Sequence, residues 1–414
     1  MKTTRIIIVG AGFGGVYTFK KLHKFFHNNP RVELSIIAEK SYFLFSPLLH
    51  EVATGSISPE NIVEPIRSMF RCCLRDLHLG KAERVNIKDH TVKVGDKLIP
   101  YDYLILAPGA ETNYYNIPGA QEYSFSLKSL EDAIVIKNHI IGQVEKASHV
   151  TESETRKNML RFVIVGGGPT GVEFAAELQE FLTETFVKFY PKEVINDASV
   201  VLIQKAPELL MQMGEKLRKK SFRLLQKKGV EVILNADVTE VTKISITIDK
   251  EKILSTESVV WVGGVKPALI QFDEDVTHTP DGRIVVNEYL QVGGMTNVFA
   301  LGDVAAHRPN DWGAFLPALA QVAVGEALSV AENLRLVIEH KQFKKFHYYH
   351  KGDLISLGQW MALGQIKGAS FSGGFTWLLW RTVYLFKLVS WRKKMNVALD
   401  WVINFFSPRD ISKL

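Results

Sequence analysis

Apolar residues along this chain fall in short β-branched runs separated by longer segments of mixed apolar and polar positions. Two of the runs, at residues 5–15 (RIIIVGAGFGG) and 161–171 (RFVIVGGGPTG), end in a cluster of glycines. Each predicts a buried strand that leads directly into a helix. Further runs at residues 32–38, 103–106 and 200–203 predict more strands of this kind. The pattern indicates an α/β fold with two Rossmann-like units.

The glycine spacing in both clusters fits the G-x-G-x-x-G pattern of dinucleotide-binding turns. The missing side chains permit a tight turn, close approach of the backbone to a pyrophosphate, and close packing of helix on strand. The helix N-terminus adds amide donors and positive potential. A single match can have a purely steric explanation. Two matches, each at a strand-to-helix junction, predict that the chain binds two dinucleotides and passes electrons between them. The positions are Gly10, Gly12, Phe13, Gly14 and Gly15 in the first cluster and Gly166, Gly168, Pro169, Thr170 and Gly171 in the second.

The residues that follow the next strand of each unit are expected to contact a ribose. In the first unit this place holds Glu39, beside Lys40, and the carboxylate would accept hydrogen bonds from an adenosine ribose. A solvated loop acid is the alternative. In the second unit the place holds Gln204 and then Lys205. We expect NADH as the preferred donor. NADPH should also be tolerated, because a neutral amide does not repel its 2′-phosphate.

Composition and charge do not indicate any other class of protein. The chain has 414 residues, which suffices for two or three domains, and its net charge of +6 comes without a nucleic-acid-binding module. No nucleic-acid partner is expected. The first strand begins at Arg5 with no leader before it, which favours a cytoplasmic chain.

The two cysteines and a pair of histidines are candidates for redox or metal-binding sites. Cys72 and Cys73 are adjacent, and neighbouring residues rarely adopt disulfide geometry, so an electron relay through a protein disulfide is not expected. We interpret the pair as structural, with a reactive thiol as the alternative. His347 and His350 have no third ligand near them in the sequence, and no metal is expected.

Four motifs in order resemble the two-dinucleotide flavoprotein reductases: the first glycine cluster, Ala107-Pro108-Gly109, the second cluster, and NVFALGD at residues 297–303. The resemblance implies that Gly302 and Asp303 hold FAD together with the first cluster and residues 107–109, with Asp303 bonding the ribityl chain. An inserted unit, including Gly264, would hold the nicotinamide nucleotide. The implied domains are FAD-binding at residues 1–114 and 286–345, NAD(P)H-binding at 115–285, and a C-terminal membrane-associating region at 346–414.

Other segments are similar to type II NADH:quinone oxidoreductases, the single-subunit enzymes that do not pump protons. They are residues 45–55 (FSPLLHEVATG), residues 316–323 (LPALAQVA) and the tryptophan-rich tail. In that family an Ala-Gln motif lies beside the flavin and the quinone, so the resemblance implies Ala320 and Gln321 as flavin contacts and Gln321 as catalytic. The family often continues with a second glutamine, whereas this sequence has Val324-Gly325-Glu326.

The remaining candidate site residues, Gln321 and Glu173, lie near the predicted starts of two helices. Pro317 suits the first turn of a helix at residues 317–338, whose N-terminal dipole would stabilise negative charge on a reduced flavin. A packing helix in which Gln321 caps backbone is the alternative. Glu173 is expected in the first turn after the second cluster, where an acid suits the helix dipole without any catalytic purpose. The family places this glutamate near the nicotinamide and the isoalloxazine, and both interpretations stay open.

The tail at residues 376–406 combines tryptophans with basic residues. Its charges are too frequent for a bilayer-spanning segment. We expect amphipathic helices that lie in the headgroup zone of anionic lipid, with the aromatic rings buried there. A core helix or a homodimer interface is the alternative. The tryptophan and tyrosine residues of this tail are Trp377, Trp380, Tyr384, Trp391 and Trp401, and its basic residues include Arg392, Lys393 and Lys394.

Together these expectations describe hydride transfer from NADH to the flavin N5 and two-electron reduction of a membrane quinone, on the cytoplasmic face of the cell membrane. Two alternatives remain. One is a soluble NAD(P)H reductase for another acceptor, and the other is a non-enzymatic, redox-sensing nucleotide-binding protein.

Overall fold

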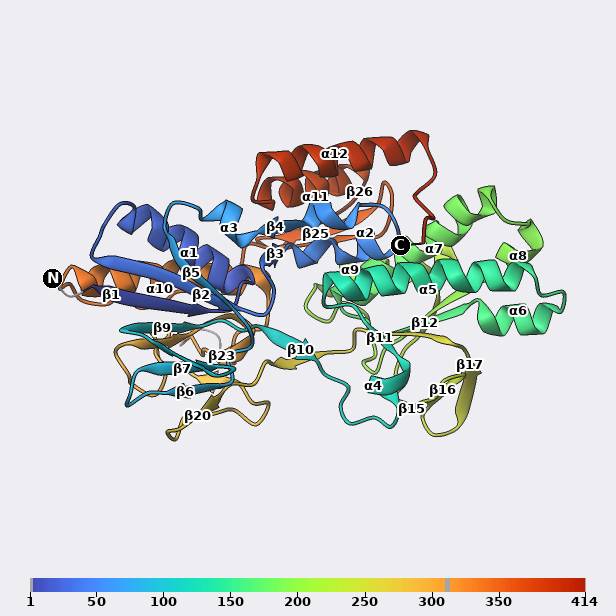
Figure 1. Ribbon diagram of the computed structural model, residues 1–414. Helices are drawn as coiled ribbons and strands as arrows, with labels where there is room; N and C mark the ends of the chain where they lie inside the picture. Colours follow the sequence, from blue (N-terminus) through green and yellow to red (C-terminus); the bar gives the residue numbers. More distant parts are fainter. Residues whose placement is uncertain (1–2, 310–312, 414) are drawn as a thin grey trace. The chain divides into compact units, whose positions relative to one another are not determined.

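The computed structural model describes residues 3–309 and 313–413 (Figure 1). The chain forms two compact units, and each is assembled from three separate stretches of sequence. Unit 1 contains Met1–Phe43, Glu64–Glu111 and Lys266–His350, and unit 2 contains Leu44–Val63, Thr112–Val265 and Lys351–Leu414.

Unit 1 is built on a five-stranded parallel sheet with the order β22-β9-β1-β2-β5. Helix α1 (Phe13–Phe26) packs on β1 and β2 and also against α10 (Ala320–Ile338) (Figure 1). The inner strands are buried along most of their length, as expected for a parallel sheet covered on its faces. The strands are β1 (Thr4–Val9), β2 (Val32–Ala38), β5 (Leu74–Leu79), β9 (Tyr103–Leu106) and β22 (Val298–Ala300).

Smaller elements complete unit 1. Unit 1 also contains a four-stranded sheet with the order β20-β6-β7-β8 and a two-stranded sheet in which β21 pairs with β23. These elements are α3 (Ile66–Met69), β6 (Arg84–Asn86), β7 (Thr91–Val94), β8 (Lys97–Pro100), β20 (Gln271–Phe272), β21 (Ile284–Val285), η5 (Gly302–Val304) and β23 (Ala305–Ala306).

Unit 2 repeats the parallel design with the sheet order β11-β18-β12-β13-β14. Helix α7 (Pro169–Glu180) follows β12 and packs on β13, so this unit has the same strand-turn-helix start as unit 1. The strands are β11 (Phe125–Ser126), β12 (Arg161–Val165), β13 (Ser199–Ile203), β14 (Glu231–Ile233) and β18 (Ser258–Trp261).

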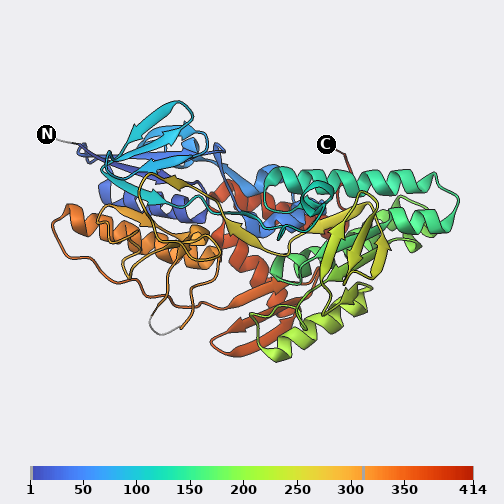
Figure 2. The same ribbon diagram turned by 90° about the horizontal axis from the view of Figure 1, so that it is seen from below.

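The C-terminal stretch adds an antiparallel sheet and two helices to unit 2. Strand β25 (Ala362–Ile366) lies between β24 (Asp353–Ser356) and β26 (Ala369–Gly373), next to α9 (Glu215–Lys228) (Figure 2). Helices α11 (Gly374–Lys387) and α12 (Trp391–Phe406) follow, and α12 packs on η2 (Pro59–Ile62). Within residues 3–309 and 313–413, none of the helices is both long and apolar enough to cross a membrane.

The other elements belong to unit 2 or to the segments that connect the two units. They are β3 (Tyr42–Leu44), η1 (Ser46–Leu48), α2 (Leu49–Ala53), β4 (Val63–Pro65), β10 (Ala110–Thr112), α4 (Ala120–Tyr123), α5 (Leu130–Ser148), α6 (Ser153–Met159), η3 (Phe181–Thr185), η4 (Phe186–Lys188), α8 (Lys192–Asn196), β15 (Val238–Val241), β16 (Ser245–Ile248), β17 (Lys252–Ser255) and β19 (Val265–Pro267).

The predicted α/β fold with two parallel-sheet units is confirmed. The predicted start of the helix at residues 317–338 is wrong, because α10 begins at Ala320 and Pro317 lies before it. Leu319, in extended conformation, is the N-cap residue instead. Proline suits a first turn but also occurs in extended backbone, so the residue alone does not decide where a helix starts.

Candidate functional site

The first glycine cluster forms a turn that leaves room beside the start of α1. Gly10 has a φ of +103°, and a Cβ there would lie 1.9 Å from the carbonyl oxygen of Ala107. A Cβ on Gly15 would lie 1.9 Å from the carbonyl oxygen of Gly10. By contrast, a Cβ on Gly12, the N-cap of α1, would meet no atom of the described chain within 4 Å beyond its own neighbours and helix. This open position beside free helix amides fits a pyrophosphate.

The second cluster repeats this geometry in unit 2. A Cβ on Gly171 would lie 1.9 Å from the carbonyl oxygen of Gly166, which has a φ of +117°. Gly168, the N-cap of α7, is open in the same sense as Gly12, again as far as the described residues show. Pro169 and Thr170 then form the first turn of α7. The chain therefore has two equivalent places for the phosphates of a dinucleotide.

The other residues predicted for FAD in unit 1 gather at one edge of its sheet. Glu39 and Lys40 follow β2 and are exposed, Ala107 to Gly109 follow β9, and Gly302 and Asp303 form η5 after β22. These strands run parallel to β1 in the same sheet, with β2 and β9 beside β1 and β22 beside β9, so their carboxyl ends meet at the edge that carries Gly12. The arrangement fits one extended dinucleotide that crosses this edge. Phe13 and Gly14 belong to the same edge, where the side chain of Leu301 lies against Gly14.

The start of α10 also belongs to unit 1 and carries Ala320 and Gln321. One turn further, the carboxylate of Glu326 accepts a hydrogen bond of 2.6 Å from the backbone N–H of Gly302. Burial, with a smaller contribution from the neighbouring Asp303, raises the pKa of Glu326 to about 8 against the lowering effect of the hydrogen bond from Gly302. Glu326 thus fixes the glycine that precedes Asp303. In the sequence alone, this residue is visible only as a departure from a family motif.

In unit 2, Gln204 has a structural partner. Its Oε1 accepts a hydrogen bond of 2.9 Å from the N–H of Gly167, inside the second glycine cluster. The adjacent Lys205 forms an ion pair of 2.7 Å with Asp237, although both side chains are well exposed. A Cβ on Gly264 would lie 2.1 Å from the Tyr115 hydroxyl oxygen, so this glycine accommodates the tyrosine ring.

Glu173 does not lie in the first turn of α7, and the helix-dipole explanation for it is wrong. The helix begins at Pro169, which places Glu173 in the second turn, and the residue is buried. Its Oε1 accepts a hydrogen bond of 3.0 Å from the N–H of Ser356. Burial raises the pKa of Glu173 to about 8, and the nearby carboxyls of Glu51 and Glu177 add to the rise. The side chain is therefore protonated at neutral pH.

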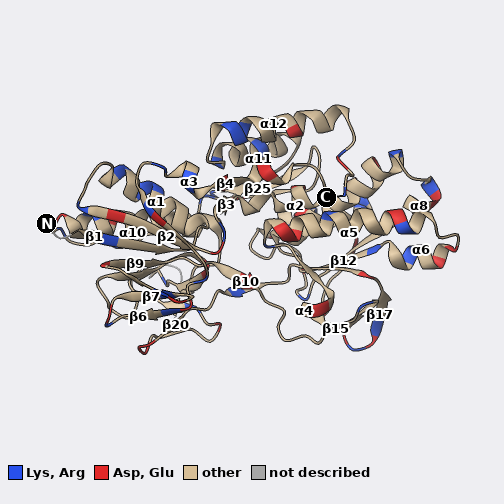
Figure 3. Ribbon diagram, in the orientation of Figure 1, with Lys and Arg blue, Asp and Glu red and all other residues tan. Residues whose placement is uncertain are grey.

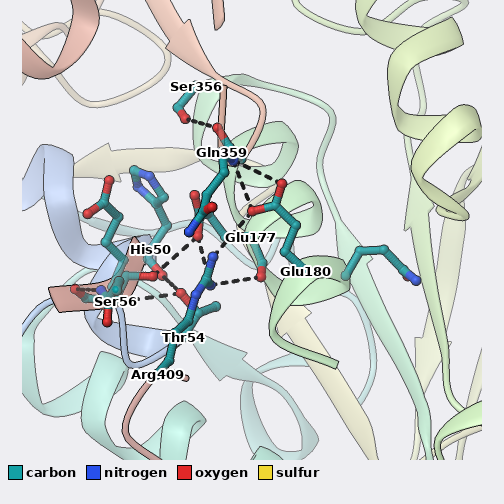
Figure 4. A network of polar contacts seen from close by, with 12 residues as sticks. His50, Thr54, Ser56, Glu177, Glu180, Ser356, Gln359 and Arg409 are labelled. Carbon is teal, nitrogen blue, oxygen red and sulfur yellow. Dashed lines mark hydrogen bonds and ion pairs between the residues drawn. The ribbon is translucent and has the colours of Figure 1, made fainter. Parts of the chain in front are cut away.

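Glu173 interacts with Glu177 and so adjoins a buried polar cluster that the sequence did not predict; its members Glu177, Glu180 and Arg409 are shown in Figure 4. Arg409 donates to Glu177, with 2.8 Å between Nη1 and Oε2, and to Glu180, with 3.2 Å between Nη2 and Oε2. Glu180 also pairs with Lys228 and accepts from the N–H of Gln359 at 2.9 Å. The three glutamates lie on one helix face because their spacing is i, i+4 and i+7. That spacing was the available sequence signal, whereas nothing near Arg409 in the sequence marks it as their partner.

The segment at residues 44–63 adds two further groups to this cluster. Glu51 accepts a hydrogen bond of 2.6 Å from the indole Nε1 of Trp401. Burial raises the pKa of Glu51 to about 7 against the lowering effect of Arg381, and burial lowers the pKa of His50 to about 4. Burial also raises the pKa of Glu177, but Arg409, with help from His50 and Arg381, outweighs it and keeps that pKa below its usual range.

The aromatic residues of the tail divide into two groups. Trp377, Trp380 and Trp401 are buried inside unit 2, so the expectation that they lie in lipid is wrong for these three. The guanidinium of Arg381 lies over the rings of Trp377 and Trp401, at 4.2 and 4.4 Å from their centroids. Trp391 is 72% exposed. Spacing alone does not reveal which side of an amphipathic helix faces the protein.

Two parallel-sheet units, each with an open glycine at the start of a helix, define a two-dinucleotide flavoprotein oxidoreductase. Residues 4–327 match the family described as pyridine nucleotide-disulphide oxidoreductase, and residues 350–410 match the NDH2 C-terminal domain. The chain belongs to the type II NADH:quinone oxidoreductase family.

Two relatives support this membership, and a solved structure shows the same fold. The chain is 32% identical to type II NADH:quinone oxidoreductase Ndh of Mycobacterium tuberculosis, over 98% of this chain and 89% of that protein. It is 33% identical to NdhA of the same organism, over 97% and 87% of the two chains. The structure of NDH2 from Plasmodium falciparum in complex with NADH has the same fold, with a TM-score of 0.91, 23% identity and full coverage of both chains.

The predicted family, enzyme class and cofactors, FAD and NADH, are thereby confirmed, and a quinone is the electron acceptor of this family. The roles of individual site residues and the bounds of the functional domains stay predictions.

Proposed function

We infer that this enzyme oxidises NADH and reduces a quinone by way of FAD, without pumping protons. The overall reaction converts NADH, one proton and a quinone to NAD⁺ and a quinol. The observation that carries this function is the pair of open glycines, Gly12 and Gly168, each at the start of a helix after a parallel strand. When bound, FAD supplies the chemistry that accepts two electrons from the nicotinamide and passes them on.

Unit 1 would hold FAD at the sheet edge described above. Gly12 and the first amides of α1 suit the pyrophosphate, Glu39 suits the adenosine ribose, and Asp303 suits the hydroxyls of the ribityl chain. The positive N-terminal end of α10, with Ala320 and Gln321, suits a flavin ring that gains negative charge. We keep Gln321 as the catalytic candidate of this group.

Unit 2 would hold NADH with Gly168 and the start of α7 at the pyrophosphate. Gln204 stands where many dinucleotide folds have an acid for the ribose. Because its Oε1 already accepts from Gly167, its amide nitrogen is the atom oriented to donate to a ligand. A donor in this position suits a ribose hydroxyl and does not repel a phosphate.

The buried carboxyls of unit 2 would hold protons for quinone reduction. A quinone that gains two electrons also takes up two protons, and groups with a pKa near the working pH transfer protons best. Burial places the pKa of Glu51 near 7 and that of Glu173 near 8. We propose Glu173 as the catalytic proton carrier, because its carboxyl group is buried, has a pKa near 8 and is held by a hydrogen bond from the backbone N–H of Ser356.

Helices α11 and α12 would place the enzyme on an anionic lipid surface at the cytoplasmic face of the cell membrane. Lys and Arg residues gather near the start of α12, where the ribbon is blue (Figure 3). Large apolar side chains with 44 to 85% exposure follow one stripe of each helix, and such a stripe is typical of an interfacial helix. We call it the apolar face: Phe375, Leu378, Phe386, Trp391, Met395, Leu399, Val402, Ile403 and Phe406. A homodimer through this face is the competing outcome.

An anaerobic titration tests the enzymatic function. NADH added to the purified protein should bleach the flavin absorption, and a soluble quinone added afterwards should restore it. The Gly168→Ala variant should keep its FAD and respond to dithionite but bleach poorly with NADH. Flavin that NADH reduces but no quinone reoxidises would contradict the proposed acceptor, and unchanged bleaching in Gly168→Ala would contradict the NADH site.

A further inference from the structure

Two histidines and two cysteines of unit 1 meet away from the edge that carries the glycine cluster. His23 lies in the last turn of α1 and His27 is the residue that caps its C-terminal end, and Cys72 and Cys73 lie in the turn between α3 and β5. Their four ligand atoms all lie within 4.8 Å of one another. From Gly12 to His23 the helix rises by roughly 16 Å, so this cluster is separate from the proposed pyrophosphate position.

The distances between these atoms fit tetrahedral coordination. His27 Nδ1 lies 3.3 Å from Cys73 Sγ and 4.0 Å from Cys72 Sγ, and His23 Nε2 lies 3.8 Å from Cys72 Sγ. Zinc with Zn–S bonds of about 2.3 Å and Zn–N bonds of about 2.0 Å holds its nitrogen and sulfur ligands about 3.5 Å apart. The observed distances lie on both sides of this value, so small side-chain rotations would suffice to close the shell.

We propose that His23, His27, Cys72 and Cys73 form a structural Zn²⁺ site. The H-x₃-H spacing at the end of α1 is that of zinc sites, and two imidazoles with two thiolates make a complete tetrahedral ligand set. On binding, both thiol protons pass to the solvent, and the two thiolates balance the charge of the ion. Adjacent cysteines depart from the usual C-x₂₋₄-C spacing, so no sequence motif announces the site.

The state of the histidines agrees with a ligand role. His23 directs its Nε2 toward the cysteines, 3.8 Å from Cys72 Sγ, so this nitrogen is placed to bind a metal. Its Nδ1 is buried without a hydrogen-bond partner among the residues that the structure describes. The ring of His27 meets that of His23 edge to face, with 4.9 Å between centroids.

A bound ion would join the second half of α1 to the turn before β5, which are 45 residues apart in sequence at His27 and Cys72. Helix α1 starts at the proposed pyrophosphate position, so this link would brace the FAD-binding unit. Zn²⁺ has no redox chemistry, and the site has no part in electron transfer.

The test uses the full-length protein with FAD bound, reduced with a phosphine and freed of metal by dialysis against a chelator. Zn²⁺ is titrated in competition with a chromophoric chelator, and Co²⁺ is added separately as a spectroscopic probe. We expect one tightly bound Zn²⁺ per chain, thiolate-to-Co²⁺ charge transfer, red d–d bands of tetrahedral Co²⁺, and protection of both thiols from a thiol reagent. His149→Asn serves as the control, because His149 is an exposed histidine of unit 2.

The variants Cys73→Ser and His27→Asn should each weaken Zn²⁺ binding by on the order of a hundredfold or more, since even groups behind the ligands contribute up to that much. Both should retain FAD and NADH oxidation, which shows that the fold persists. Zn²⁺ should raise the thermal midpoint of the wild type and of His149→Asn only. The proposal is overturned if Zn²⁺ binds equally to Cys73→Ser and wild type, if Co²⁺ shows octahedral bands without thiolate charge transfer, or if the thiols react equally fast with and without Zn²⁺.

Discussion

The indole of Trp401 donates a hydrogen bond of 2.6 Å to Glu51, a residue 350 positions earlier in the chain. Both side chains are buried in unit 2, and Glu51 lies in the short segment on which α12 packs. Further bonds secure the same contact: the carboxylate of Asp400 accepts from the N–H of Ser58 at 3.0 Å and from Asn61 Nδ2 at 2.8 Å. Helix α12 is therefore fixed to the protein by one side, while its other side remains exposed.

Replacing Trp401 by Phe should destabilise the protein by on the order of 1–3 kcal/mol, because a buried carboxyl oxygen loses its donor. The lost bond also lowers the pKa of Glu51 in the wild type, so the variant should raise that pKa further and lose more stability at pH 9 than at pH 6. Thermal unfolding at both pH values measures the effect. Trp391→Phe, at an exposed position, should change the midpoint little.

Replacing Trp391 and Phe406 by Ser should reduce binding to anionic vesicles by about tenfold or more, because both side chains belong to the apolar face and would otherwise enter the lipid. Vesicle co-sedimentation at low and high salt measures binding. Reduction of a soluble quinone should persist. If the double variant instead changes the molar mass in solution and leaves vesicle binding intact, the apolar face is a dimer interface.

Glu173→Gln should make stability less dependent on pH. In the wild type the pKa is about 8 in the folded state, against an ordinary value of 4.5 in the unfolded chain. The folded state thus binds more protons between these values, and the contribution of this group to stability falls as pH rises from 4.5 to 8. Glutamine keeps an acceptor for the N–H of Ser356 and does not titrate. The difference in unfolding free energy, variant minus wild type, should therefore rise by up to about 1.4 kcal/mol per pH unit in this window.

The matched control is Glu193→Gln, at an exposed position on α8, which should leave the pH dependence unchanged. Quinone turnover provides the functional readout for the same pair. A slower turnover in Glu173→Gln with normal flavin reduction by NADH supports a proton role. Wild-type turnover and wild-type pH dependence in this variant would remove Glu173 from the mechanism.

Gly12→Ala and Gly168→Ala should separate the two dinucleotide sites. Both glycines have negative φ, and a Cβ at either position meets open space in the described structure, so both variants should fold. The added methyl would occupy the proposed pyrophosphate positions. Gly12→Ala should purify with much less FAD, and Gly168→Ala should keep FAD but bind NADH at least about tenfold more weakly, a loss of about 1.4 kcal/mol. Flavin content and NADH titrations distinguish the two, and losses in the opposite sense would contradict the assignment.

Gln204→Glu should impair the use of NADPH selectively. A carboxylate can still accept from the N–H of Gly167, so the turn is retained, but it adds a negative charge where a 2′-phosphate would lie. The ratio of kcat/KM for NADPH to that for NADH should fall about tenfold or more. An equal loss with both donors would show that Gln204 only supports the turn.

Local sequence determined the parts of this protein in which chemistry and backbone conformation belong to the same few residues. The clusters around Gly12 and Gly168 were predictable because each strand, turn and helix start is encoded within about a dozen positions and demands glycine for steric reasons. The alternation of apolar runs predicted the parallel sheets for the same local reason. The helix start at Pro317 was not predictable, because proline suits both a first turn and the extended chain before it.

Only the tertiary structure decided which distant polar groups share an environment. Nothing local to Arg409 indicates that it neutralises Glu177, and nothing local to Cys73 indicates that His27 lies 3.3 Å away. The pKa of Glu173 depends on burial, which is set by the packing of α7 within unit 2 and not by neighbours in sequence. Likewise, periodicity showed that the C-terminal helices are two-sided, but packing alone decided that Trp401 faces the protein and Trp391 faces outward.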